Sequence, residues 1–155
     1  MPCKKFDIIF LYYVLEHVKN PVSFLANVKK YLRDYSSKLI IEVPNINEAL
    51  ISLYKSSAYN EFVWQRAHYS YFATATLTNL FSRLNLAAEL IPVQKYDFSN
   101  HIYWLIEGLP GGSGKYNGIF SEELAMLYKE NLKASWLCDA ILAIVSLGKE
   151  EKHEK

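Results

Sequence analysis

Two histidines and one carboxylate are the side chains of this sequence best suited to moving a proton. Glu16 and His17 are adjacent, and His68 lies well downstream of them. Imidazole is the commonest general base of enzymes because its pKa lies near neutrality. We therefore identify His17 and His68 as candidate catalytic residues that would take a proton from a hydroxyl or an amine. The alternative is that Glu16 and His17 only make local hydrogen bonds and that His68 holds a loop.

A glycine-rich segment, GGSGK at residues 111–115, suggests phosphate binding but fails the required pattern. A phosphate loop needs a glycine five residues before Gly114, where Leu109 stands, and a serine or threonine after Lys115, where Tyr116 stands. The segment is therefore interpreted as a flexible connection.

Composition narrows the classes of protein that remain. A chain of 155 residues with about half its residues apolar can bury one core, so a single domain is expected. A net charge of +1 offers no basic field for nucleic acid, which leaves small molecules or proteins as partners. Cys3 and Cys138 are too far apart in sequence for a zinc motif or a disulfide framework, which fits a reducing cytoplasm. The apolar stretches are too short to cross a membrane.

The first part of the chain is typical of a strand, helix and strand unit. Residues 6–11 are β-branched and aromatic, as in a strand buried on both faces. Asn20 and Pro21 then cap and begin a helix that ends near Asp34. Residues 38–43 form a second strand, which Pro44 ends. Such a unit implies parallel pairing through a right-handed crossover.

The rest of the chain continues this α/β pattern. Apolar spacing predicts helices at residues 46–59 and 74–84, and the composition of residues 86–93 predicts a strand. Asp97 or Ser99 caps a short helix that Gly108 ends, and Ser121 caps a further helix. Residues 140–147 are ambiguous between helix and strand, and their β-branched residues favour a strand. We expect one domain over residues 1–148 and a disordered charged tail over residues 149–155.

Three motifs together resemble the second half of the class I S-adenosylmethionine-dependent methyltransferases. They are FDII at residues 6–9, VLEHV with the following NP at residues 14–21, and IIEVPN at residues 40–45. The similarity continues through HYSYF at residues 68–72 to DAI at residues 139–141. The resemblance implies a partial Rossmann-like sheet of about four strands with flanking helices, mixed in direction, with the last strand antiparallel.

The resemblance also suggests roles for particular residues. Tyr12, Tyr13 and Glu16 follow the strand whose loop touches the cofactor in the family, and aromatic faces suit a sulfonium cation. His101, Tyr103 and Trp104 fall in the insertion where specificity for the methyl acceptor commonly lies. Packing within the core or a loop is the competing interpretation for all these aromatic residues.

Some members of the family bind a divalent metal through the pattern Glu-x-x-Glu-His. In this sequence Tyr13 stands at the first position of that pattern, so a hard cation would have too few oxygen ligands. We therefore expect no metal site.

The family's glycine-rich turn and the acidic residue that hold S-adenosylmethionine lie upstream of the part that this chain resembles. S-adenosylmethionine is thus the cofactor expected for the intact family domain, but we do not expect this chain alone to bind it. We expect the chain to be the acceptor-side half of an enzyme that methylates a small molecule, inactive alone. The strand at residues 6–11 would lack a neighbour, which favours a homodimer or pairing with a missing N-terminal half. The alternatives are a non-catalytic remnant or interaction module that dimerises through that strand, and a fragment of a longer gene.

Overall fold

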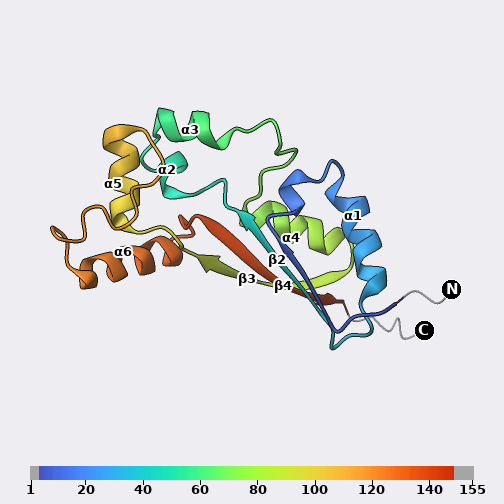
Figure 1. The fold of residues 1–155 in the computed structure, drawn as a ribbon. Coiled ribbons are helices and arrows are strands. Elements are labelled where there is room, and N and C mark those ends of the chain that lie inside the picture. Colours follow the sequence, from blue (N-terminus) through green and yellow to red (C-terminus); the bar gives the residue numbers. More distant parts are fainter. Residues whose placement is uncertain (1–3, 149–155) are drawn as a thin grey trace.

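A computed structural model describes residues 4–148 of the chain, which form a mixed four-stranded sheet flanked by helices (Figure 1). The strands are β1 (Ile8–Tyr12), β2 (Lys38–Pro44), β3 (Leu86–Val93) and β4 (Ala140–Leu147). Their order across the sheet is β1-β2-β4-β3. β1 and β2 are parallel, whereas β4 is antiparallel to both of its neighbours. This arrangement confirms the expected fold class, including the antiparallel last strand.

The helix between the first two strands is α1 (Pro21–Val28), followed by a 3₁₀ turn at Lys29–Tyr31. The Asn20 side chain accepts a 3.0 Å hydrogen bond from the backbone N–H of Ser23, as the sequence predicts for a cap ahead of Pro21. β1 begins at Ile8 rather than Phe6, because Phe6 makes only an isolated bridge to Leu32.

The predicted helix at residues 46–59 is wrong as a single element. The structure has two short helices there, α2 (Ala49–Ser52) and α3 (Ser57–Val63). Lys55 between them has a φ of 52°, a left-handed conformation that an α-helix cannot continue through. Ser56 then caps α3 by accepting a hydrogen bond from the N–H of Tyr59. The apolar spacing of this segment therefore continues across a break in the backbone.

The remaining helices match their predicted positions. They are α4 (Thr74–Arg83), α5 (Phe98–Glu107) and α6 (Glu122–Ala134). Asp97 rather than Ser99 caps α5, and Gly108 ends it with a φ of 68°, a conformation that glycine adopts without strain. Ser121 caps α6 through the N–H of Leu124.

The main core lies on one face of the sheet. Side chains from β2 and β4, among them Leu39, Ile41 and Val145, are fully buried in it. Figure 1 shows α1 and α4 on the same side of the sheet. The other helices lie beyond the end of the sheet at which β2 finishes, and α6 extends below them.

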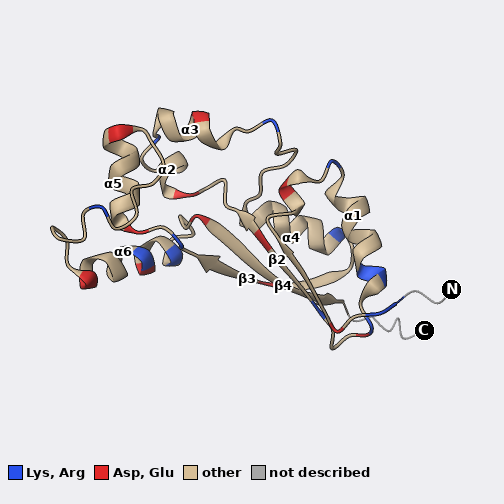
Figure 2. Cartoon of the chain, in the orientation of Figure 1, with Lys and Arg blue, Asp and Glu red and all other residues tan. Residues whose placement is uncertain are grey.

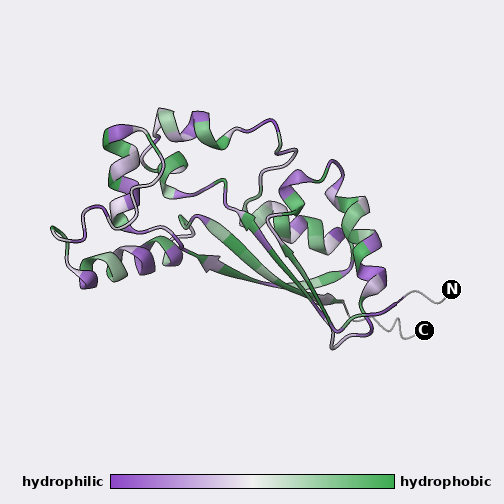
Figure 3. Cartoon of the chain, viewed as in Figure 1, coloured by the Kyte–Doolittle hydropathy of each residue, from purple (hydrophilic) through white to green (hydrophobic). Residues whose placement is uncertain are grey.

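The opposite face of β1 is open. Ile8, Phe10 and Tyr12 are each about half exposed, at 52%, 57% and 50%. Burial of the first strand on both faces was therefore a wrong prediction, because no helix of residues 4–148 covers this side. In Figure 3 the strands carry the colour of hydrophobic residues along most of their length.

Two further expectations concern the ends of the chain and membranes. The predicted disordered tail at residues 149–155 lies outside the described residues, as does Cys3. Within residues 4–148, no helix combines the length and the apolar character needed to cross a bilayer.

Candidate functional site

A cavity of about 310 Å³ opens at the carboxyl end of β2, between the sheet and α3. Ligands of open α/β sheets bind at such strand ends. Six of its lining residues carry the chemistry, and they come from separate segments of the chain: Tyr13, Glu48, Tyr59, His68, Lys95 and Asp139. Acidic residues lie where β2 ends and where β4 begins (Figure 2).

Glu48, which immediately precedes α2, is the most buried carboxylate of the cavity wall, with an exposure of 4%. The hydroxyl of Tyr59 donates a 2.5 Å hydrogen bond to its Oε1, while its Oε2 has no hydrogen-bond partner among the described residues. Burial raises the pKa of Glu48 to about 8, the bond from Tyr59 opposes that rise, and the charge of Asp139 adds to it. Glu48 is thus a carboxyl group that changes its charge near neutral pH.

Asp139, just ahead of β4, is held by the backbone. It accepts hydrogen bonds from the N–H groups of Lys95 and Tyr96, at 3.0 Å and 2.9 Å. Burial raises its pKa, and these two N–H donors counteract part of that rise. Asn45 supports the same corner, because its amide donates to the carbonyls of Trp136 and Cys138. The loop after β2 is thereby tied to the segment that leads into β4.

Lys95 is engaged by its neighbours rather than free. Its ammonium forms an ion pair with Glu42 of β2 and donates a 2.6 Å hydrogen bond to the hydroxyl of Tyr13. The ammonium also lies 4.4 Å from the centre of the Tyr13 ring, a cation–π distance. Burial alone would lower the pKa of Lys95, but the contacts with Glu42 and Tyr13 outweigh it and raise that pKa. Burial raises the pKa of Tyr13 to about 12, so its hydroxyl keeps its proton.

The three residues singled out first in the sequence come together next to this cavity. The rings of His17 and His68 are 4.8 Å apart and pack edge to face. Nδ1 of His17 lies 3.0 Å from the carbonyl oxygen of Ala67, so Nε2 is the ring nitrogen that remains for a ligand. His68 itself lines the cavity, and burial together with the charge of His17 lowers its pKa. Glu16 is buried at 2% exposure, and its Oε2 has no partner among the described residues.

Glu16, His17 and His68 could also hold a metal ion. Each offers one ligand atom, and the three atoms lie within 4.8 Å of one another. The sequence predicted no metal site because Tyr13 replaces an oxygen ligand near Glu16. That prediction did not consider His68, which the fold brings close to Glu16 and His17. One carboxylate and two imidazoles form a donor set that zinc accepts more readily than magnesium or calcium. The expectation stays a prediction.

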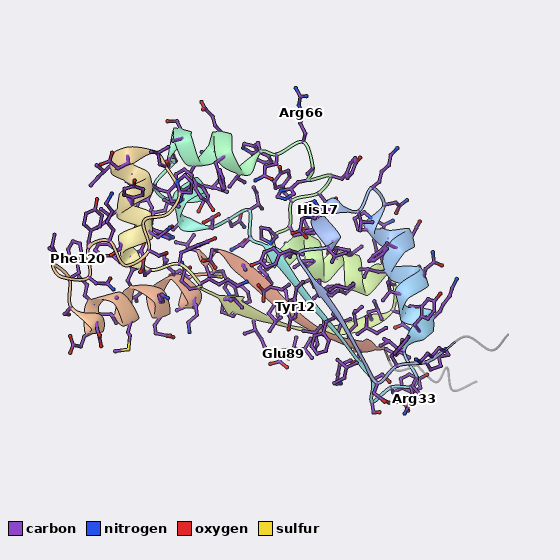
Figure 4. All side chains as sticks on the ribbon, viewed as in Figure 1. Tyr12, His17, Arg33, Arg66, Glu89 and Phe120 are labelled. Atoms are coloured by element: carbon purple, nitrogen blue, oxygen red, sulfur yellow. The ribbon has the colours of Figure 1, made fainter. Side chains whose placement is uncertain are left out.

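The other predicted cofactor residue, Tyr12, lies elsewhere. Its side chain stacks on Phe10 on the open face of the sheet, with ring centres 5.7 Å apart. In Figure 4 His17 is labelled above the strands, whereas the label of Tyr12 lies at their level. Of the predicted cofactor residues, Tyr13 lines the cavity and Glu16 lies beside it.

The predicted acceptor residues on α5 do not line the cavity. His101 is buried at 1% exposure, and its Nδ1 lies 2.6 Å from the hydroxyl of Tyr128 on α6. Burial lowers the pKa of His101 to about 4. Trp104 packs edge to face on Tyr59, and Tyr103 lies under the ammonium of Lys115. Of these three residues, Trp104 contacts the cavity wall, because its ring packs on that of Tyr59.

Sequence reasoning missed four residues of the cavity lining, which are Glu48, Tyr59, Lys95 and Asp139. It also missed Glu42, which does not line the cavity but pairs with Lys95. Two signals could have found some of them. Glu42 interrupts an otherwise apolar strand, and Asp139 stands directly before another apolar run. A charged residue in such a place is costly to bury unless it is paired or functional.

The sequence matches a known protein family over more than half of its length. Residues 2–91 match the sequence model of a family described as "Methyltransferase domain". No curated protein matches the sequence significantly.

Solved structures show the same fold. A SAM-dependent methyltransferase from Archaeoglobus fulgidus is 20% identical, with a TM-score of 0.53 over 94% of this chain and 61% of that one. The YcgJ protein from Bacillus subtilis is 14% identical, with a TM-score of 0.53 over 96% and 67%. The plantazolicin methyltransferase BamL, solved with a triazolic desmethylPZN analog and SAH, is 16% identical, with a TM-score of 0.51 over 94% and 55%. The chain thus spans between 55% and 67% of the length of these three proteins. Because the family match covers more than half of its residues, the chain belongs to the class I S-adenosylmethionine-dependent methyltransferases.

Proposed function

We propose that this chain forms the acceptor-side half of an S-adenosylmethionine-dependent methyltransferase that acts on a small molecule. The cavity at the carboxyl end of β2 carries this proposal, because it combines an apolar wall with the inward carboxyl group of Glu48 and the imidazole of His68. A mostly apolar cavity with a few polar groups is the usual form of a small-molecule site.

The described residues do not form a complete cofactor site. Tyr13 and Glu16 at the end of β1 supply one wall, whereas β1 pairs only with β2 and has no strand on its other side. The sequence contains no glycine ahead of Gly108, so the family's glycine-rich turn is not among these residues. S-adenosylmethionine would supply the methyl group when bound, and we propose that a further segment or polypeptide beside β1 completes its site.

Within such an assembly, His68 is the proposed general base, with His17 beside it. Burial and the charge of His17 lower the pKa of His68, which favours the neutral ring with a nitrogen able to accept a proton. If Nδ1 of His17 donates to the carbonyl of Ala67, its Nε2 is likewise an acceptor. Either nitrogen would receive the proton that an acceptor hydroxyl or amine loses.

Isothermal titration with S-adenosylhomocysteine tests the incomplete site. The chain alone should show no micromolar binding, and a polypeptide that carries the upstream half of the domain should restore it. Micromolar binding by the chain alone would contradict the proposal that a wall is missing. If the assembled form binds cofactor, His68→Ala should lower the rate of methyl transfer by roughly 100-fold or more, the usual contribution of a general base.

A second candidate function is an interaction module, and the open face of β1 favours it. Ile8, Phe10 and Tyr12 form an exposed apolar row on an edge strand, which is a template for association. Size-exclusion chromatography with light scattering should then show a dimer that Phe10→Lys dissociates. Ile119→Lys, at an exposed position outside the sheet, is the matched control. A monodisperse monomer would count against this function.

The remaining parts of the proposal concern the setting of the protein. We propose a cytoplasmic protein, on the ground of its two widely spaced cysteines. Its near-neutral net charge favours a small-molecule acceptor over nucleic acid or a membrane surface.

A further inference from the structure

The Oε2 atom of Glu48 is a buried polar atom whose hydrogen-bonding capacity is unused among the described residues. Glu48 is 96% buried, by its exposure of 4%, and this oxygen has no hydrogen-bond partner among the described residues. A buried carboxyl oxygen without a hydrogen-bond partner is unfavourable, so such an atom in a native protein needs an explanation, and a bound ligand provides one. Its partner oxygen is already satisfied by Tyr59, which orients the group. A ligand that donates a hydrogen bond would complete the site.

The charges around the cavity favour a cationic donor. Asp139 adds a second buried carboxylate to the lining. The ammonium of Lys95 is already paired with Glu42, and the lining contains no other lysine and no arginine among the described residues. No cation of the lining is therefore available to balance an anionic ligand. A positive group beside Glu48 would gain Coulomb energy in a site of low dielectric constant.

The aromatic side chains of the cavity lining also favour a positively charged ligand. The rings of Tyr59, Phe62, Tyr71 and Tyr96 line the cavity together with that of Tyr13. Aromatic faces attract ammonium groups and also bury the carbon skeleton that carries them. Trp104 fixes the ring of Tyr59 from behind, at a centre-to-centre distance of 4.9 Å.

From these contacts we infer that the cavity takes an acceptor with a protonated amine, which donates to Oε2 of Glu48 while its apolar body lies against the aromatic rings. This inference rests on the proposed function, since it names the class of acceptor for the same cavity. The inference also predicts that hydroxyl and carboxylate analogues of the acceptor bind less tightly than the amine. His68 would then accept the proton that the ammonium must lose before its nitrogen can react.

The pKa of Glu48 predicts that binding of a cationic ligand releases a proton. With a pKa raised to about 8, Glu48 is largely protonated at pH 7 in the free protein. A cation that binds beside it favours the carboxylate, so binding should release a proton. Of the titratable groups around Glu48, Tyr59 bonds to it and Asp139 acts on it through its charge. The other titratable groups of the cavity lining are Tyr13, His68, Tyr71, Tyr96 and the paired Lys95. Because Tyr59 keeps its proton over this range, the release should come from the carboxylates.

The test uses three probes of similar size and different charge: 2-phenylethylamine, 2-phenylethanol and 3-phenylpropionate. Each is titrated into the whole chain at pH 7 by calorimetry in two buffers with different ionisation enthalpies. The amine should bind about 10-fold or more tightly than the alcohol, as expected for a charge-assisted hydrogen bond, and the carboxylate should bind least. Comparison of the two buffers should reveal proton release with the amine alone.

Matched variants locate the effect. Glu48→Gln keeps the shape of the side chain but removes the charge, so it should abolish both the amine preference and the proton release. Glu61→Gln, an exposed carboxylate on α3, should change neither. Circular dichroism on both variants establishes that they are folded.

The outcomes separate the two proposals. Equal or tighter binding of the alcohol or the carboxylate overturns the amine assignment and leaves an acceptor cavity of another class. An amine preference that survives in Glu48→Gln also overturns it. If none of the three probes binds at millimolar concentration, the cavity is not an acceptor site and the proposed function fails as well.

Discussion

The hydroxyl of Tyr59 on α3 donates a 2.5 Å hydrogen bond to Oε1 of Glu48, which immediately precedes α2. This contact joins two short helices whose connecting residues include the left-handed Lys55. It also determines which carboxylate oxygen remains without a partner in the cavity. The bond therefore has two effects. It docks α3 against the residue that precedes α2, and it orients the carboxyl group of Glu48.

Removal of that bond should destabilise the protein. Tyr59→Phe deprives a buried carboxyl group of its donor, so we expect the free energy of unfolding to fall by about 1–3 kcal/mol. The pKa of Glu48 should rise further, since the bond from Tyr59 opposes its rise. Urea denaturation measures the first effect. Tyr35→Phe, at an exposed tyrosine, should alter stability little, and an equal loss in both variants would refute this account.

Glu48 should make the protein less stable as the pH rises. Its pKa is about 8 in the folded chain against 4.5 for an exposed group, so the folded state binds more protons between these values. Stability contributed by Glu48 is therefore full below pH 4.5 and is lost as the pH rises to about 8. The slope cannot exceed about 1.4 kcal/mol per pH unit for one group. Unfolding curves at several pH values should show this slope in the natural chain and not in Glu48→Gln.

His101 should produce the opposite dependence at lower pH. Its pKa is lowered to about 4 by burial, with the nearby charge of Asp97 opposing that change, against 6.5 for an exposed histidine. The unfolded state then binds more protons between pH 4 and 6.5, so stability is lost as the pH falls through this interval. His101→Gln should flatten this limb of the profile, whereas His17→Gln, at an exposed position, should preserve it. Thermal unfolding at graded pH values provides the measurement.

Asn45 should be intolerant of a negative charge. Its amide donates to the carbonyls of Trp136 and Cys138 at 3.0 Å and 2.9 Å. Asn45→Asp would place a carboxylate oxygen against those carbonyl oxygens, and we expect a loss of about 2–4 kcal/mol from repulsion and unpaired acceptors. Asn47→Asp, two residues away and exposed, is the control. Similar stabilities of the two variants in urea would disprove the role of this bridge.

Much of the local structure was predictable from the sequence. Composition located the four strands, and the caps at Asn20, Ser121 and Gly108 lie where they were expected. Each of these features depends on residues within a few positions of one another, so a local pattern contains the necessary information. The exception is the segment that holds α2 and α3, where regular apolar spacing continued across a break at Lys55.

The site was only partly predictable, because its parts come from distant segments. The motifs identified Tyr13, Glu16 and the two histidines, but the pairing of His17 with His68 required the fold. Glu48 and Asp139 meet because β4 inserts between β2 and β3, which brings the segment before β4 beside the loop after β2.

By itself, the sequence determined the family, the strand, helix and strand unit, and the helix caps, since these depend on the order of residues along the chain. Only the tertiary structure decided that Glu48 has an oxygen without a partner, that Lys95 is neutralised by Glu42, and that one face of β1 is open. The physical reason is that burial and charge pairing depend on which surfaces meet in three dimensions. Neither quantity is a property of a residue and its neighbours in sequence.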